Sequence, residues 1–528
     1  MGIYINPEVG GYSIFASSKI FIDKSSLIAL LNERLNENHN YLCVTMPSRF
    51  GKTYIASMLA SYYSKGADSS EIFKNSAISR EIKYREHLNH HNVIKIDIAH
   101  LCVSKNDTDL SRLVCKYVLP ELRLAYPSVA IPMDASFDEA LVLIYKETKE
   151  RFIFIIDEWD YLLRNYPDNQ RMFDDYIGFL RSLFKSELTK PCFELVYMTG
   201  IMPIKRYGSM SALNDFEECS MVSPKSMGPF FGFSQEEVKT VIAQSKTKLS
   251  LETLKDWYDG YMFQSVGEVY CPNSVVNACR NDACADYSAD TIAIEAITMG
   301  LKNHYISLEK ESGILLSGGK VRVNPSNFSG DLSNIDSSDK GLTALIHAGF
   351  LSYDPLSESV HIPNKEMMLR FASAVESLRF AGLSEALFDS VDIVNATLQE
   401  NTNAIEKAFD KYHQEFVSLY AKTDENVLSV LLQIIYVSAR KRYIALKEPC
   451  LGLGRADAVF LPAEGVKSPA IIVELKVDDS SDSAIAQIKN KEYFKPLESY
   501  YGDILLVGVS FDKQSLKHNA KIERISKD

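Results

Sequence analysis

The sequence predicts an α/β protein in three parts: an N-terminal domain on a parallel sheet, a mostly helical middle with a winged-helix-like unit, and a C-terminal α/β domain. Three observations predict it. The first 200 residues alternate short apolar runs with helical patterns, the pattern becomes mostly helical from about residue 233, and strand-like runs return after Cys450. Strands that alternate with helices are typical of a buried parallel sheet. We expect the boundaries at 1–230, 231–384 and 385–528.

The N-terminal elements follow from hydrophobic periodicity. Residues 52–65 have apolar side chains at helical spacing, and Ser136 with Glu139 forms a capping box before another helical pattern. Short apolar runs, each expected to be a strand, occupy Tyr41–Met46, Asn92–Ile98, Phe152–Ile156 and Phe193–Met198.

The middle and C-terminal elements follow from the same signals. Ser234 and Glu237 form a capping box at the start of a helix. A helical pattern, a turn at Asp354-Pro355 and a strand-like run predict the winged-helix-like unit at 341–366, and the polar stretch 311–340 predicts a long loop. The C-terminal strands are expected at Ala456–Leu461, Ala470–Leu475 and Ile504–Val509.

Composition and charge restrict the function. The chain has 528 residues, with 57 basic and 69 acidic side chains and a net charge of −12. This balance argues against a protein coated in basic surface for nucleic-acid or membrane binding, although a local basic groove stays compatible with it. Nine cysteines without a C-x-x-C pair indicate reduced thiols. With no signal peptide and no membrane-length apolar run, we expect a cytoplasmic protein that does not bind membranes.

A phosphate-binding loop is predicted at residues 47–53, between an apolar run and a helix. Backbone N–H groups of such a loop surround phosphates, Lys52 would reach the β- and γ-phosphates, and the Thr53 hydroxyl would ligate Mg²⁺. The full phosphate-binding pattern has Gly at the position that Met46 occupies in this chain, so the match is incomplete. The predicted loop residues are Pro47, Ser48, Arg49, Phe50, Gly51, Lys52 and Thr53.

A second motif supports a nucleotide site. The apolar run Phe152–Ile156 ends in Asp157 and Glu158, so a buried strand would deliver Asp157 to the Mg²⁺ shell and Glu158 to the attacking water. Thr199 ends the next run and would sense the γ-phosphate. The alternative is a core strand that meets an exposed acidic turn. Arg206 is either a γ-phosphate-sensing cation or a surface charge.

A metal-nuclease constellation is predicted near the C-terminus. Asp457 precedes a strand-like run, and Glu474 and Lys476 lie two residues apart, on one face of the next strand. The two carboxylates suit Mg²⁺ or Mn²⁺, and Lys476 would help to deprotonate or orient a water. Gln487, on a following helix, would complete the site. Glu425 could add a carboxylate, but a helix N-terminal charge explains it equally. The alternative for Glu474-Leu475-Lys476 is a surface turn.

The chain resembles an AAA-ATPase-like family whose members carry a C-terminal PD-(D/E)XK nuclease superfamily domain. The resemblance covers about residues 5–515 and implies the fold and the activity class. One departure is Cys271, where the family usually has Asn. The motifs that carry it are Phe21–Ser25, Pro47–Thr53, Ile156–Glu158, Thr199-Gly200, Leu213-Asn214, Tyr258–Phe263, Tyr270–Ser274, Gly454–Asp457, Glu474–Lys476 and Ala484–Tyr493.

We therefore expect an ATP-binding and ATP-hydrolysing protein coupled to a metal-dependent nuclease. Its cofactors would be ATP and Mg²⁺, with Mn²⁺ also suited to the nuclease site. Its partners would be ATP, nucleic acid (DNA before RNA) and, as an ATP-dependent homo-oligomer, further copies of itself. The alternative is an ATP-switched DNA- or partner-binding regulator, in defence or mobile elements, with an idle nuclease domain and with 341–366 as its binding segment.

Three further expectations concern side chains that have no part in the predicted chemistry. The aromatic residues of Tyr258–Phe263 indicate core, with a stacking platform as the alternative. The group His87, His90 and His91 is expected to face solvent rather than to bind zinc. Residues 513–528 carry a local charge of +3, from five basic and two acidic side chains, so we expect weak, salt-sensitive contact with nucleic acid there.

Overall fold

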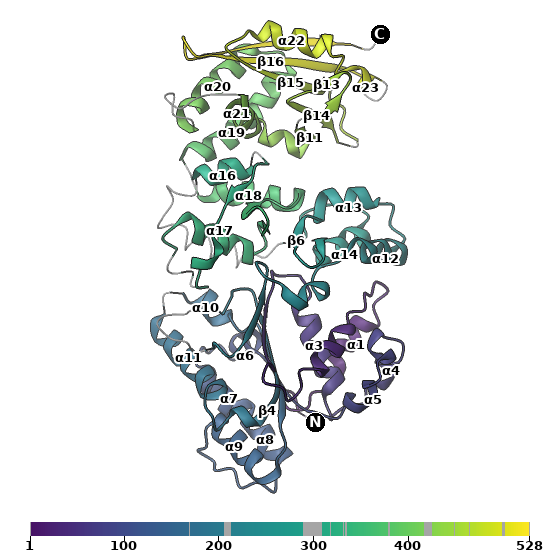
Figure 1. The fold of residues 1–528 in the computed structure, drawn as a ribbon, viewed down its shortest axis with the longest axis vertical. Helices are drawn as coiled ribbons and strands as arrows, with labels where there is room; N and C mark the ends of the chain where they lie inside the picture. Colours follow the sequence, from purple (N-terminus) through teal and green to yellow (C-terminus); the bar gives the residue numbers. More distant parts are fainter. Residues whose placement is uncertain are drawn as a thin grey trace. The chain divides into compact units, whose positions relative to one another are not determined.

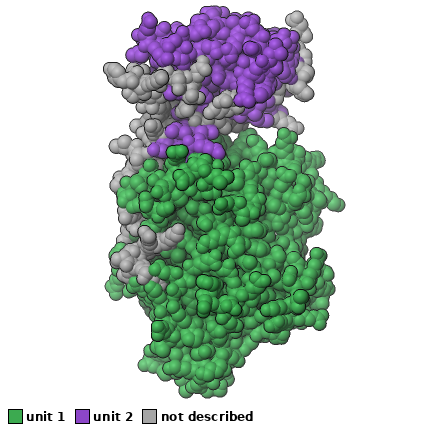
Figure 2. All heavy atoms as spheres, viewed as in Figure 1, with its two compact units in different colours: residues 1–304, 322–370 green, residues 305–321, 371–528 purple. Residues whose placement is uncertain are grey.

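The structure is a computed structural model. It describes residues 2–526 apart from 168, 205–212, 289–308, 317, 331, 333–334, 379–380, 417–424, 448, 464 and 499–501. Two compact units are present: residues 1–304 with 322–370, and residues 305–321 with 371–528 (Figure 2). Each unit is described below by itself.

A five-stranded parallel sheet forms the centre of the first unit (Figure 1). Every residue of its strands β1 and β3 is buried. Strands buried on both faces read as continuous apolar runs, which explains why the sequence locates them so well. In spatial order the strands are β2 (Asn92–Asp97), β3 (Phe152–Asp157), β4 (Phe193–Gly200), β1 (Tyr41–Thr45) and β5 (Glu217–Ser220).

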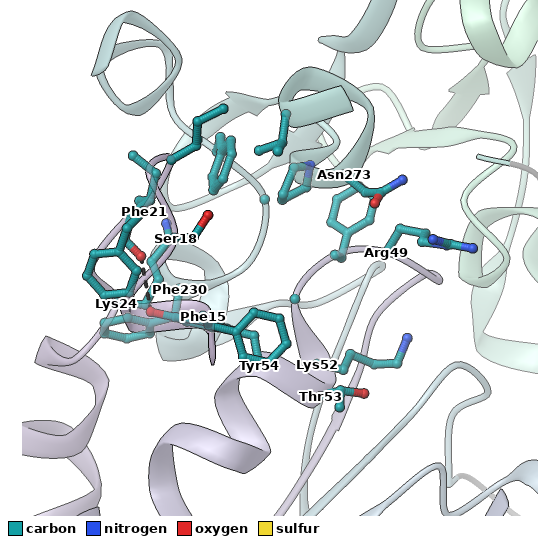
Figure 3. Close-up of a pocket in the computed structure, with 18 of the residues that line it drawn as sticks. Phe15, Ser18, Phe21, Lys24, Arg49, Lys52, Thr53, Tyr54, Phe230 and Asn273 are labelled. Carbon is teal, nitrogen blue, oxygen red and sulfur yellow. Dashed lines mark hydrogen bonds between the residues drawn. The ribbon is translucent and has the colours of Figure 1, made fainter. Parts of the chain in front are cut away.

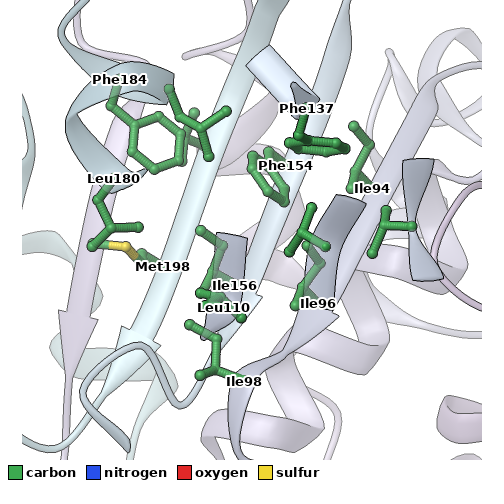
Figure 4. Close-up of a cluster of buried hydrophobic side chains, with 14 of the residues drawn as sticks. Ile94, Ile96, Ile98, Leu110, Phe137, Phe154, Ile156, Leu180, Phe184 and Met198 are labelled. Atoms are coloured by element: carbon green, nitrogen blue, oxygen red, sulfur yellow. The ribbon is translucent and has the colours of Figure 1, made fainter. Parts of the chain in front are cut away.

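Helices cover this sheet. On one face, Phe154 and Ile156 of β3 pack with Leu110, Phe137 and Leu180 from three helices (Figure 4). Burial of each such side chain contributes roughly 1.5–3 kcal/mol. The helices of this region are α1 (Gly10–Ala16), α2 (Ser26–Asn32), α3 (Lys52–Tyr63), α4 (Ser70–Phe73), α5 (Tyr84–His87), α6 (Ile98–Lys105), α7 (Leu110–Tyr117), α8 (Leu119–Ala125), α9 (Phe137–Thr148), α10 (Tyr161–Asn165) and α11 (Gln170–Phe184).

The rest of the first unit is largely helical, as predicted. The capping box of Ser234 and Glu237 starts α12 (Gln235–Ser245). The predicted helix and two-strand turn are also present, because β9 pairs antiparallel with β10 directly after α17. The elements are α13 (Leu251–Tyr258), β6 (Tyr261–Phe263), β7 (Gly267–Val269), α14 (Pro272–Asn281), α17 (Ser338–His347), β9 (Ser352–Asp354), β10 (Ser359–His361) and the start of α18 (Lys365–Leu378).

The long loop predicted at 311–340 is wrong in part. Helix α16 (Glu309–Leu316) occupies its first residues, where Ile314, Leu315 and Leu316 supply apolar side chains that the Gly/Ser-rich composition of the following stretch obscures. Among the described residues from 318 to 337, regular structure is limited to β8 (Val321–Arg322) and the 3-10 turn Pro325–Asn327.

The second unit carries a mixed five-stranded sheet. In order its strands are β11 (Tyr443–Lys447), β14 (Ala458–Pro462), β15 (Ala470–Val477), β16 (Ile504–Asp512) and β17 (Lys517–Ile525), with β15 and β16 parallel and the other neighbours antiparallel. The predicted C-terminal strands are thus confirmed. A two-stranded ribbon joins β12 (Cys450–Leu451) to β13 (Gly454–Arg455). The helices are α19 (Ala381–Leu398), α20 (Thr402–Phe416), α21 (Glu425–Ile435), α22 (Ser481–Asn490) and α23 (Lys495–Glu498).

The α/β architecture with a parallel and a mixed sheet confirms the predicted fold class. Among the described residues, no helix combines the length and the apolar character that a bilayer span requires. The predicted boundary at residue 385 lies within α19.

Candidate nucleotide site and candidate nuclease site

The loop at residues 47–53 leaves β1 and curls into α3. Arg49 and Gly51 adopt left-handed backbone conformations, with φ of 71° and 93°. These turn the chain so that Gly51 caps α3, whose N-terminus carries positive partial charge. The Lys52 side chain is buried, and its Nζ donates to the Pro47 carbonyl at 2.9 Å. The ammonium is thus held inside the loop, where it could contact the oxygens of a bound phosphate.

Met46, at the position of the missing first glycine, is fully buried. Its backbone N–H donates to the Gly200 carbonyl at 3.0 Å, which extends the β1–β4 pairing by one residue. A side chain at this position therefore points into the core and leaves the phosphate side of the loop open.

Asp157 ends β3 at the carboxyl edge of the sheet and is 1% exposed. Its Oδ1 accepts from the Glu158 N–H at 3.1 Å, whereas Oδ2 is buried without a hydrogen-bond partner. Burial raises the pKa of Asp157 to about 6, although the neighbouring Thr53 hydroxyl and the charge of Lys52 lower it. A buried carboxylate oxygen without a partner, beside a hydroxyl, fits the inner shell of Mg²⁺.

Thr199 lies between the two motifs because β4 separates β1 from β3 in the sheet. It pairs with Val44 of β1, and it is fully buried with no hydrogen-bond partner for Oγ1. The structure therefore brings Thr199 to the same sheet edge as Lys52 and Asp157, where ligands of open parallel sheets bind. Arg206 lies outside the described residues.

Glu158 follows Asp157 in a left-handed conformation, with φ of 55°. Arg164, one turn along α10, pairs with Glu158 at 2.5 Å and with fully buried Asp160 at 2.8 Å. Burial raises the pKa of Glu158, against the opposing effects of the Lys52 and Arg164 cations. The sequence analysis did not identify Arg164 as a functional residue, although Asp160 and Arg164 have the i, i+4 spacing of a helical ion pair.

A pocket of about 550 Å³ opens beside the loop (Figure 3). That volume lies within the range of small-molecule sites. Its polar end holds Arg49, Lys52, Thr53 and Glu158. Arg280 of α14 also lines the pocket and donates to Ser18 Oγ, another lining side chain, at 3.3 Å. Its apolar end is lined by Phe15, Phe21, Ile22, Tyr54, Phe230 and Phe233.

Sequence reasoning missed most of this pocket wall. Phe21 and Ile22 stood in a family motif without an assigned role, and Arg280 stood in no motif at all. The missing signal is tertiary, because the wall joins segments about 200 residues apart in the chain.

The predicted nuclease residues converge on the middle of the mixed sheet. Asp457, just before β14, accepts from the Leu475 N–H of β15 through Oδ2 at 2.7 Å. Glu474 is 3% exposed, and its Oε1 accepts from Lys476 Nζ at 3.0 Å and from Gln487 of α22. The structure therefore places both carboxylates, the lysine and the glutamine together, which argues against the surface-turn alternative.

Sequence reasoning also missed Tyr493 as a neighbour of this site. Its hydroxyl accepts from Gln487 Nε2 at 3.3 Å, so the tyrosine holds the amide that contacts Glu474. Among the described residues no group of three or more His, Cys, Asp or Glu side chains could hold a metal. A metal here would rest on Asp457 and Glu474, with water and phosphate oxygens as further ligands, as Mg²⁺ prefers. The Glu425 side chain lies outside the described part.

The predicted basic strip is largely neutralised. Of the described cations in 513–528, four each pair with a carboxylate, as in Lys513–Asp478 at 2.8 Å, which reduces the charge that they present to a polyanion. These four are Lys513, Lys517, Lys521 and Arg524; upstream of the strip, Lys489 and Lys495 pair with Glu523 and Glu492.

The predicted exposure of the histidine group is wrong for two members. His91 is 12% exposed on its side chain and contacts Glu194 at 2.6 Å, and His87 contacts His91 at 3.1 Å. The carboxylate partner lies 103 residues away, which hid it from local analysis. His90 is exposed, as expected.

Two family models match the chain. Residues 12–209 match the AAA-ATPase-like family of predicted AAA-ATPases, and residues 423–521 match the PD-(D/E)XK nuclease superfamily. A search of curated proteins finds no significant match. The first matched segment contains Lys52, Asp157 and Thr199 but not the pocket residues from Phe230 to Arg280, and the second contains the candidate nuclease residues. The chain therefore combines an AAA-ATPase-like domain with a domain of the PD-(D/E)XK nuclease superfamily.

Proposed function

We propose that the protein is an ATP-regulated, Mg²⁺- or Mn²⁺-dependent nuclease. The observation that carries the proposal is the presence of two separate carboxylate sites on one chain, one beside a phosphate-binding loop and one beside a lysine. ATP binding at the first site would set the activity of the second.

ATP would lie in the pocket with its triphosphate along residues 47–53 and its base among the aromatic side chains. The Lys52 ammonium and the α3 N-terminus offset phosphate charge, while Thr53 and Asp157 would hold Mg²⁺, which supplies further positive charge at the phosphates. Thr199, whose buried hydroxyl lacks a partner, would contact the γ-phosphate or the attacking water.

Glu158 would polarise the water that attacks the γ-phosphate. Burial moves the pKa of this carboxylate toward neutral pH, and a general base is most effective when its pKa lies near the working pH. The ion pair with Arg164 sets the position of Glu158 and, while it is intact, opposes proton uptake by the carboxylate. Release of this contact on ATP binding would activate the base.

At the second site, Asp457 and Glu474 would hold the metal against the scissile phosphate. Lys476 would orient the attacking water and offset the phosphate charge, and Gln487 fixes Glu474 through the same oxygen, Oε1, that accepts from Lys476. DNA is the first substrate to test, with RNA second.

The alternative is an ATP-switched regulator that binds DNA through 341–366. Two observations disfavour it. Seven consecutive residues of α17, Gly341–His347, are buried, so this helix lacks the exposed face that a groove-reading helix needs. The turn of the following hairpin carries Asp354 and Glu358, which repel phosphate.

A cleavage assay tests the proposal. Purified protein is incubated with single- and double-stranded DNA and RNA, in Mg²⁺ or Mn²⁺, with and without ATP. Asp457→Ala and Lys476→Ala should abolish cleavage and retain ATP binding, whereas Lys513→Ala, a surface lysine paired with Asp478, should cleave like wild type. Wild-type cleavage by Lys476→Ala would show that the assigned site is wrong.

ATP turnover is measured on the same preparations. Lys52→Ala should abolish it, while Lys65→Ala, which removes an exposed lysine paired with Glu150, should leave it unchanged. Absence of cleavage under every condition, with enzyme in excess, would reject the nuclease half and favour the regulator. Sizing with and without ATP tests the proposed oligomer.

A further inference from the structure

The aromatic segment Tyr258–Phe263 has no role in the proposed chemistry, yet it contacts the phosphate-binding loop. The buried Tyr261 ring meets Phe50 edge-on, with centroids 5.0 Å apart. Its hydroxyl donates to the Gly349 carbonyl at 2.8 Å. Gly349 backs directly onto the loop, since a Cβ added there would lie 2.7 Å from Pro47 Cβ. The outer side of the loop therefore rests on Tyr261 and Gly349.

The same segment is tied to the first turn of α18. Asn364 donates from Nδ2 to the Asp259 carbonyl at 2.7 Å and accepts the Met367 N–H of α18 at 3.0 Å. Gly260 approaches the Pro363 carbonyl so closely that an added Cβ would lie 2.2 Å from that oxygen. Direct contacts thus run without a break from the phosphate side of the pocket to α18.

A second route reaches α18 from the other wall of the pocket. Helix α14 lines the pocket through Asn273 and Arg280. Ser274 of the same helix donates to the carboxylate of Glu366, which is fully buried, at 2.9–3.0 Å. Glu366, in the first turn of α18, also accepts the Tyr287 N–H at 2.7 Å. Both walls of the pocket are therefore bonded to one helical turn.

The loop has an internal contact that a triphosphate would disturb. Lys52 Nζ donates to the carbonyl of Pro47, the residue that presses on Gly349, and phosphate oxygens would compete for that ammonium. Packed chains of this kind carry coupling where an element has two arrangements. The chain of α18 passes from the first unit into the second after Arg370.

We propose that the first turn of α18, held by Asn364 and Glu366, responds to the nucleotide in the pocket and transmits its state along the chain to the nuclease-bearing unit. This inference rests on the proposed ATP site. It gives the Tyr258–Phe263 segment a function, as a positioning element between the phosphate-binding loop and α18.

Hydrogen exchange on the full-length protein tests the inference without requiring cleavage. ATP with Mg²⁺ should slow exchange of the amides at 365–371 by about fivefold or more, the lower end of typical coupling. The double variant Tyr261→Phe, Ser274→Ala removes one hydrogen bond from each route. It should bind ATP like wild type and lose the ATP effect at 365–371. The control Tyr63→Phe removes an equivalent buried bond, to Asn32 at 2.8 Å, and should keep it.

Each outcome decides a different question. Wild-type protein that binds ATP without any change at 365–371 overturns the inference and leaves the proposed function intact. Wild-type protein that does not bind ATP overturns the proposed function and the inference together. Should the double variant fail to fold, Tyr261→Phe alone tests the phosphate-side route, and a full ATP effect in it overturns that route. Where cleavage is measurable, its ATP dependence should disappear in the double variant.

Discussion

The two carboxylate sites differ in how their buried charges are satisfied. In the candidate nucleotide site, burial raises the pKa of Asp157, and the buried Lys52 ammonium donates to the backbone carbonyl of Pro47. In the nuclease site, Glu474 contacts both Lys476 and Gln487. Burial therefore disfavours the charged form of Asp157, whereas the buried Glu474 carboxylate is already paired with a cation, Lys476.

This difference predicts opposite changes in the free energy of unfolding when each carboxylate is replaced by an amide, although both replacements should lower turnover. Asp157→Asn and Glu474→Gln should each lower the corresponding turnover by about 10³-fold or more, since each removes a proposed metal ligand. Near pH 8, Asp157→Asn should raise the free energy of unfolding by about 1–2 kcal/mol, because it removes a buried charge. Glu474→Gln should lower it by about 1–3 kcal/mol, because it removes the buried carboxylate that accepts from Lys476. Urea unfolding measures both, and changes of equal sign would contradict the comparison.

Arg164 is the cation that compensates charge around the nucleotide site. Arg164→Ala leaves fully buried Asp160 without its ion pair, so we expect a loss of about 3 kcal/mol in the free energy of unfolding. The control is Arg112→Ala, an arginine paired with Asp107 but 65% exposed, which should cost under about 1 kcal/mol. Similar losses in the two variants would mean that burial does not determine how much each ion pair contributes to the free energy of unfolding.

The pH dependence of stability should also separate the sites. The folded-state pKa of Asp157 is about 6, above its ordinary 3.8, so the folded protein binds this proton more tightly than the unfolded chain does. The contribution to stability is therefore present below about pH 4 and is lost as pH rises through about 6, by up to about 3 kcal/mol. Urea unfolding of wild type and Asp157→Asn between pH 4 and 8 gives the difference, which should shrink toward low pH. If the difference in the free energy of unfolding between wild type and Asp157→Asn stayed constant with pH, the raised pKa of Asp157 would be refuted.

The smallest expected effect concerns Thr199. Thr199→Val removes a buried hydroxyl that has no hydrogen-bond partner, so the free energy of unfolding should change by less than about 0.5 kcal/mol, while ATP turnover falls about tenfold. The control Thr189→Val removes a hydroxyl that donates to the Ser182 carbonyl at 3.2 Å, and should cost about 1 kcal/mol. A stability loss at Thr199 as large as that at Thr189 would indicate a structural role only.

Local sequence was informative wherever the chemistry lies in one contiguous segment. In each such segment, an apolar run lies next to polar residues at a set spacing. These segments are the loop at 47–53, the strand end at Asp157-Glu158 and the strand with Glu474 and Lys476. Partners distant in the chain were missed, as with Glu194 beside His91 and the aromatic wall of the pocket.

The sequence by itself determined the two α/β domains, four strands of the parallel sheet, three strands of the mixed sheet and the residue types of both candidate sites, because periodicity and motif spacing are local properties. It did not locate β5, β11 or β17. Only the tertiary structure decided which charges are satisfied: the strand order that places Thr199 between β1 and β3, the Arg164 ion pairs, the neutralised basic strip and the two contact routes to α18. The physical reason is that burial and pairing depend on neighbours brought together by folding, and these neighbours can lie far apart in the chain, as Thr199 and Val44 do.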